Sequence, residues 1–81
     1  MEVFIGTNLG KLKAKLKVTD DVLAETFCVS QSTANKYINN KLPVPFDIVK
    51  NILRTNKDLG MQIAGWWKEA FEKEFIKALL A

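Results

Sequence analysis

Histidine is absent from this chain, and cysteine occurs only once, at Cys28. A zinc site of the usual kind needs several Cys or His ligands, and a single thiol cannot close an internal disulfide. We therefore expect no metal, no cofactor and a cytoplasmic protein.

Long apolar runs are also missing, since none approaches the roughly 20 residues that cross a bilayer. The opening Met-Glu-Val-Phe-Ile lacks the basic flank of a secretion signal, so we expect no targeting segment and no membrane association. The chain has no glycine-rich phosphate loop, no nucleophile beside a base and no paired carboxylates placed across a cleft. We therefore do not expect an enzyme.

What the chain does contain is apolar and basic. Hydrophobic residues make up 48% of its 81 positions, which is too many for a disordered chain and suits one small domain spanning 1–81. The net charge is +3, but residues 1–57 hold nine Lys/Arg against five Asp/Glu, and residues 58–81 hold three against four. The cationic part is the front of the chain.

Apolar spacings of three and four predict a small all-α bundle of about five helices. The expected helices are 8–17 (with Leu9, Leu12 and Leu16 inward and Thr7 as a cap), 20–27, 31–39, 45 to about 55, and 59–80. The run 1–5 alone shows strand alternation, and two prolines should hold the connector 41–45 extended, with Pro45 opening the fourth helix.

The segment 21–40 is the most informative, because its apolar residues fit two short helices joined by a tight turn. The Val29 side chain would pack inward at this turn, and Ser30 would cap the second helix. The outer side of that helix carries amides, hydroxyls and one lysine but no carboxylate. Such a face suits base edges in a major groove, flanked by phosphates.

Laid out as Leu23-Ala24-(x2)-Phe27-Cys28-Val29-Ser30-Gln31-Ser32-Thr33-(x3)-Tyr37-Ile38-Asn39-Asn40-Lys41, the sequence resembles the Cro and phage-repressor family of helix-turn-helix DNA-binding proteins. The resemblance covers roughly residues 8–55. It implies four or five helices, a third helix in the major groove and a two-fold dimer on DNA.

The resemblance also implies site residues. The positions expected to contact bases are Gln31, Ser32, Thr33, Asn35 and Lys36, with Gln31 reading a base directly. The positions expected to contact phosphates are Ser30, Asn39, Asn40 and Lys41, and we add Lys11 and Lys15 because like-charged neighbours on one helix would be relieved by phosphates.

Two positions depart from the family pattern. Cys28 stands where the family favours glycine, so a residue with a side chain must adopt a backbone conformation that costs glycine less energy. We expect its thiol to be buried. Asp20 lies near an expected phosphate, which would repel its carboxylate unless that group turns toward the start of its helix.

The long final helix should extend beyond the rest of the bundle, because at about 1.5 Å per residue it spans about 33 Å. Its stripe of large aromatic residues should be buried against the bundle or against a partner. We expect one of the adjacent tryptophans to face the bundle and the other a partner. The predicted dimer or partner interface comprises Trp66, Trp67, Phe71, Phe75 and Leu79.

These features predict a sequence-specific regulator of transcription, of Cro or repressor type and from a phage or mobile element, that occupies an operator in double-stranded DNA as a homodimer. The alternative is a protein-binding adaptor, such as an antirepressor or inhibitor, that uses the final helix to bind another protein. DNA affinity that falls steeply with salt would separate the two.

Overall fold

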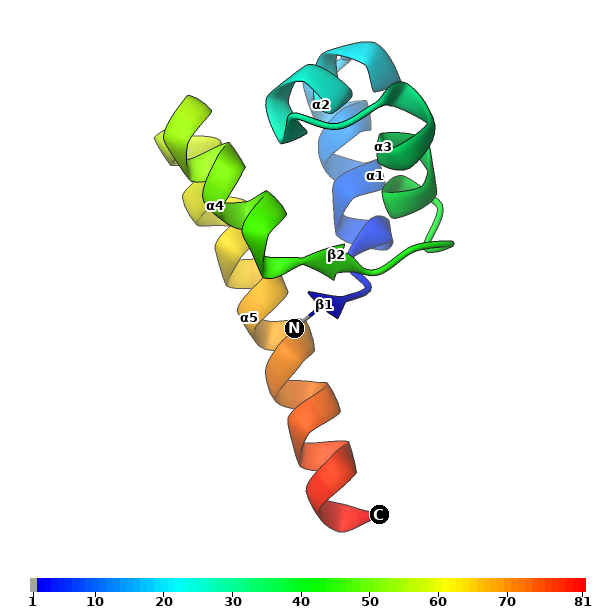
Figure 1. Cartoon of the computed structure of the whole chain (residues 1–81), viewed down its shortest axis with the longest axis vertical. Coiled ribbons are helices and arrows are strands. Elements are labelled where there is room, and N and C mark those ends of the chain that lie inside the picture. Colours follow the sequence, from blue (N-terminus) through cyan, green and yellow to red (C-terminus); the bar gives the residue numbers. More distant parts are fainter. Residues whose placement is uncertain (1) are drawn as a thin grey trace.

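The computed structural model describes residues 2–81 and confirms a small all-α bundle. The described chain forms five helices, and Figure 1 shows their arrangement. They are α1 (Gly6–Leu16), α2 (Asp20–Phe27), α3 (Gln31–Ile38), α4 (Phe46–Thr55) and α5 (Lys57–Leu80).

Two short strands join the start of the chain to its middle. β1 (Glu2–Val3) pairs antiparallel with β2 (Val44–Pro45), with Val3 opposite Val44 and both side chains buried. The predicted connector is extended at Val44–Pro45, whereas residues 41 and 42 form a bend, and its pairing with the first residues was not predicted. Pro45 ends β2 and precedes the fourth helix, which begins at Phe46 and not at the expected proline.

The first helix begins at Gly6, two residues before its predicted start, and Thr7 is not its cap. The Gly6 N–H donates to the Asn40 side-chain Oδ1 at 2.7 Å. A Cβ at Gly6 would collide with this oxygen and with the Tyr37 carbonyl, so the contact depends on glycine. Leu16 is 47% exposed at the helix end and does not extend the inner stripe as predicted.

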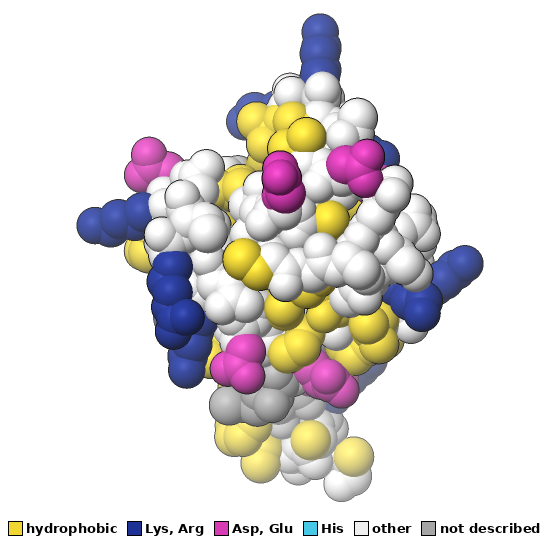
Figure 2. Space-filling model, turned by 45° about the horizontal axis from the view of Figure 1, so that its top comes forward, with side chains coloured by type: hydrophobic (Ala, Val, Ile, Leu, Met, Phe, Trp, Pro, Cys, Tyr) yellow, Lys and Arg dark blue, Asp and Glu magenta, His cyan; other side chains and the backbone are white. Residues whose placement is uncertain are grey.

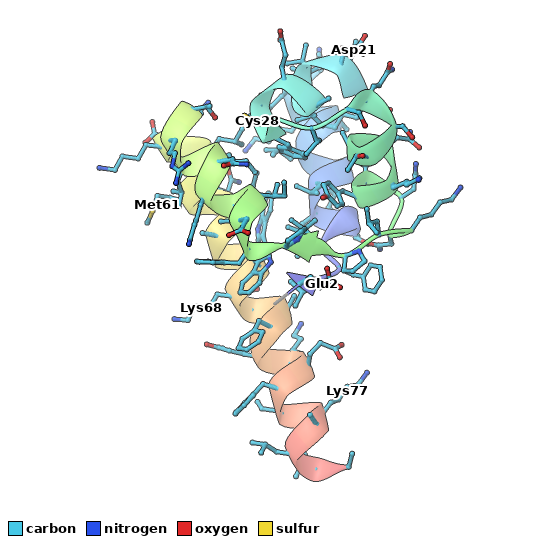
Figure 3. The ribbon with its side chains drawn as sticks, viewed as in Figure 1. Glu2, Asp21, Cys28, Met61, Lys68 and Lys77 are labelled. Atoms are coloured by element: carbon cyan, nitrogen blue, oxygen red, sulfur yellow. The ribbon has the colours of Figure 1, made fainter. Side chains whose placement is uncertain are left out.

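The α2–turn–α3 segment is a helix-turn-helix, with the expected cap at each start. Thr19 Oγ1 accepts from the Val22 N–H, and Ser30 Oγ accepts from the Thr33 N–H at 3.2 Å. Cys28 has φ 58° and ψ 42°, which is the left-handed conformation predicted there. The prediction that its thiol is buried is wrong, because the left-handed residue ends α2 at the surface (Figure 3).

The core lies where all five helices meet. Its largest fully buried side chains are Phe27, Leu9, Leu23, Ile52 and Ile63. Helices α4 and α5 pack side by side (Figure 1). Their approach depends on Gly60, because a Cβ there would lie 2.7 Å from the Leu53 Cα.

Helix α5 is covered along its first half only. Ile63 and Trp67 are buried, whereas the last turns project beyond the bundle, as the sequence predicted (Figure 1). The overhang carries large apolar side chains that are more than half exposed, namely Phe75 at 55%, Ile76 at 54%, Leu79 at 68% and Leu80 at 82%. Among residues 2–81, no helix combines the length and apolar content that a membrane crossing requires.

Candidate nucleic-acid interface

Helix α3 presents its polar side outward from a fixed base. Ala34 is 0% exposed and Tyr37 is 4% exposed on the inner side, where α3 packs against α1 and α2. Gln31, Ser32 and Lys36 are exposed on the outer side, and no side-chain hydrogen bond or ion pair within residues 2–81 engages them. These three predicted base-contacting residues therefore keep their donors and acceptors available.

Thr33 and Ser30 use their hydroxyls on one another. Ser30 Oγ donates to Thr33 Oγ1 at 2.9 Å while accepting from the Thr33 backbone. Thr33, predicted to contact a base, is half-buried, and Ser30, predicted to contact a phosphate, is exposed. The pair mainly fixes the first turn of α3.

Asn35 is held by its own chain rather than left free for a base. Its Nδ2 donates to Asp20 Oδ2 at 3.0 Å, and its Oδ1 accepts from Asn39 Nδ2 at 3.1 Å. Both ends of the Asn35 amide are thus engaged, and Asn39 donates within α3 as well. The structure brings Asn35 to the predicted surface but gives it a positioning role.

Asp20 links three helices at this point. Its carboxylate forms an ion pair with Lys13 of α1 and accepts from Asn35 of α3. The Lys13 ammonium, followed by the Asn35 amide, lowers the pKa of the Asp20 carboxyl below its ordinary value. The expected repulsion of phosphate is therefore reduced, because a neighbouring cation compensates this carboxylate.

Three of the residues predicted to contact phosphates lie at the exit from α3, namely Asn39, Asn40 and Lys41. Asn40 adopts φ 56°, a left-handed conformation that asparagine tolerates, and its side chain accepts from the Gly6 N–H at the start of α1 and also donates to Thr7 Oγ1 at 3.5 Å. Asn39 and Lys41 are exposed. Lys41 is thus the exposed cation of this exit, five positions after Lys36 and beyond the end of α3.

Lys11 and Lys15 are not brought to the surface formed by α3. They line a small hollow with Gln62 and Trp66, on the side of α1 that faces α5. Lys13, which was not predicted as a site residue, is the α1 lysine that points toward α2 and α3. Positions 11 and 13 lie about 160° apart on a helix, so the spacing alone could have separated these lysines.

The basic excess is not concentrated in one patch on the face shown in Figure 2. There, Lys and Arg side chains project from the edges, and Asp and Glu side chains lie between them. An interface on this face would therefore depend on the local chemistry of α3 and not on a broad positive field.

The predicted aromatic interface is divided by the structure. Trp67 is 6% exposed, and its Nε1 donates to the Val44 carbonyl at 2.9 Å, so it belongs to the bundle's own core and is not an interface residue as predicted. Phe71 stacks on Trp67 with ring centroids 5.5 Å apart. Trp66 and Phe71 are half-buried, and Phe75 and Leu79 are exposed.

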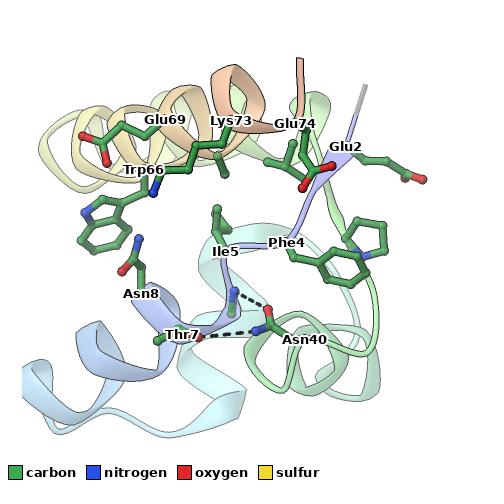
Figure 4. Close-up of a pocket in the computed structure, with 14 residues that line it drawn as sticks. Glu2, Phe4, Ile5, Thr7, Asn8, Asn40, Trp66, Glu69, Lys73 and Glu74 are labelled. Atoms are coloured by element: carbon green, nitrogen blue, oxygen red, sulfur yellow. Dashed lines mark hydrogen bonds between the residues drawn. The ribbon is translucent and has the colours of Figure 1, made fainter. Parts of the chain in front are cut away.

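A groove of about 590 Å³ separates α5 from β1 and the start of α1. Figure 4 shows Trp66, Glu69 and Lys73 on the α5 side, with Ile5 and Asn8 opposite. The sequence did not predict this groove, because it depends on how β1 and α5 are placed. Within residues 2–81, no three His, Cys, Asp or Glu side chains come together as a metal site.

No protein-family model matches this chain, and neither a curated protein nor a solved structure matches it.

Proposed function

We propose that the protein is a cytoplasmic, sequence-specific regulator that binds double-stranded DNA through α3 and acts as a homodimer by occupying an operator. The observation that carries the proposal is the outer side of α3, where Gln31, Ser32 and Lys36 are exposed and unengaged on a helix without a carboxylate. An amide such as Gln31 can pair with adenine through two hydrogen bonds.

The rigidity of this surface also supports the proposal. The Ser30 cap fixes the start of α3, and Asp20 ties its middle to α1 and α2. A helix held in this way loses little conformational freedom when it enters a groove, so more of its contact energy remains for binding. Lys41 would meet a phosphate at the edge of the site.

Selection of bound sequences from random duplex DNA, followed by a salt titration, tests the proposal. Lys41→Ala should weaken binding similarly for all sequences and reduce the slope of log affinity against log salt by about 1. Gln31→Ala should relax the preference at one base pair, which corresponds to about 1–3 kcal/mol of discrimination. Lys68→Ala, on an exposed part of α5, is the charge-matched control and should change neither property.

The exposed end of α5 favours a second function, that of an adaptor that binds another protein. Phe75, Ile76 and Leu79 are each more than half exposed, and apolar residues gathered in this way commonly mark interaction sites. No DNA binding at low salt, together with a heteromeric complex that Phe75→Ala abolishes, would favour the adaptor. Trp67→Ala cannot serve in this test, because Trp67 is part of the core.

A further inference from the structure

The groove beside α5 continues into a second hollow along the same helix. The larger groove includes Trp66 and Glu74, and the smaller hollow includes Gln62 and Trp66, with Asn8 also shared by both. Together they form a furrow between α5 and the start of the chain. Positions 62 to 74 span about 18 Å of helix, which is room for about three turns of a second helix.

The face of α5 that lines the furrow continues into the uncovered end of the same helix. At 100° per residue, Trp66, Glu69 and Lys73 share one side with Ile76 and Leu80. Trp66, Glu69 and Lys73 line the groove, whereas Ile76 and Leu80 lie beyond it and are exposed. Phe71 and Phe75 lie on the opposite side of the helix. The furrow therefore leads to an apolar surface that differs from the predicted aromatic stripe.

This face is complementary to itself when reversed. The spacing from 66 to 69, 73 and 76 is three, four and three residues, which reads the same in both directions. An antiparallel copy in this register places Ile76 against Trp66 and Lys73 against Glu69, and two-fold symmetry repeats each pair. In each pair, an apolar side chain thus contacts an apolar side chain, or an acidic side chain contacts a basic one. Ala70 lies beside the two-fold axis, where a small side chain permits close approach.

We infer that the furrow holds the C-terminal end of α5 from a second copy of this chain, in the antiparallel register just described. Leu80 of the second copy then lies at the end of the furrow that Leu12 and Gln62 line. A second copy fits better than an unrelated segment because the two pairs are reciprocal: each chain supplies both the groove and the helix end that enters it. In a two-fold dimer the symmetry itself matches the charges and the length of the groove to those of the helix end, and an unrelated partner has no such symmetry.

This pairing specifies the homodimer of the proposed function, yet it does not require DNA. Its interface shares only Trp66 with the interface predicted from the sequence. Figure 3 shows that Lys68 and Lys77 leave α5 on opposite sides, with Lys77 on the side where Glu2 lies. Substitutions on the two sides of one helix therefore distinguish the furrow dimer from a dimer formed through Phe71 and Phe75.

Sedimentation equilibrium of the full chain without DNA, over a wide concentration range, tests the inference. Ile76→Glu should weaken self-association at least tenfold, and Phe75→Glu, on the other side of the helix, less than threefold. Both residues are more than half exposed, so circular dichroism should show an unchanged fold. A chain that stays monomeric, or equal losses in the two variants, would overturn the inference.

Charge exchange provides a second and sharper measurement. Glu69→Lys alone and Lys73→Glu alone each place like charges in contact and should each weaken the dimer at least tenfold. The double variant restores opposite charges and should recover affinity to within threefold of the original. A double variant as weak as the single ones would contradict the register.

The outcomes for dimer and DNA are separable. A furrow dimer without any DNA binding would refute the proposed function and leave this inference standing. DNA binding by a chain that does not self-associate through the furrow would refute this inference and leave DNA binding as the proposed function.

Discussion

The two halves of α5 belong to one continuous helix but have opposite surroundings. In the first half, Gly60, Ile63 and Trp67 are buried against α4 and the β2 end. In the second half, the side chains of Ile76, Leu79 and Leu80 are exposed to solvent. Since both halves are rich in apolar residues, the difference lies in what covers them. An apolar pattern therefore identifies a surface that favours burial without specifying its partner.

The largest contrast between these halves should appear when a large side chain is removed from each. Trp67→Ala should lower the free energy of unfolding by about 3–5 kcal/mol, because it leaves a cavity and an unpaired Val44 carbonyl. Leu79→Ala should change it by less than about 0.5 kcal/mol in the monomer. Urea unfolding at low protein concentration measures both. Similar losses would show that the helix end is covered within its own chain.

A smaller contrast should come from adding a methyl group to two glycines of α5. Gly60→Ala should cost about 1–3 kcal/mol, since the new Cβ would meet the Leu53 backbone and force α4 and α5 apart. Gly65→Ala meets nothing within 4 Å and should stabilise the helix by about 0.5–1 kcal/mol. Thermal unfolding would show the opposite signs. Destabilisation by both would mean that the exposed side of α5 is packed.

The smallest effect should be a pH dependence of the free energy of unfolding, and it should come from Asp20 in the bundle and not from α5. The pKa of Asp20 is lowered below 3.8 by Lys13 and Asn35, so its stabilising contribution is present at neutral pH. This contribution is lost as pH falls through the folded-state pKa. The stability difference between the original chain and Asp20→Asn should therefore be constant above about pH 5 and shrink progressively as the pH falls below it. Lys13→Met should show the same trend, and a difference that stays constant below about pH 5 would contradict the linkage.

Much of the fold could be predicted from local sequence. Apolar spacing located all five helices, and the bounds of α2 were predicted correctly because Thr19 supplies a local cap. The start of α1 could not be predicted in this way. Its cap comes from Asn40, which lies 34 positions along the chain, and no local pattern records such a contact.

The candidate site was predictable in part for the same reason. The exposed side of α3 follows from its own periodicity, so Gln31, Ser32 and Lys36 were placed correctly on its surface. The engagement of Asn35 by Asp20 and the position of Lys11 beside Trp66 depend on neighbouring helices. Residue type showed what these groups could bind, but not what they already contact.

The sequence by itself determined the helices and the polar outer side of α3, because each follows from interactions between residues close in the chain. Only the tertiary structure decided which tryptophan enters the core, which amides remain available and where the furrow runs. Those outcomes depend on contacts between distant segments, whose geometry exists only once the helices have packed.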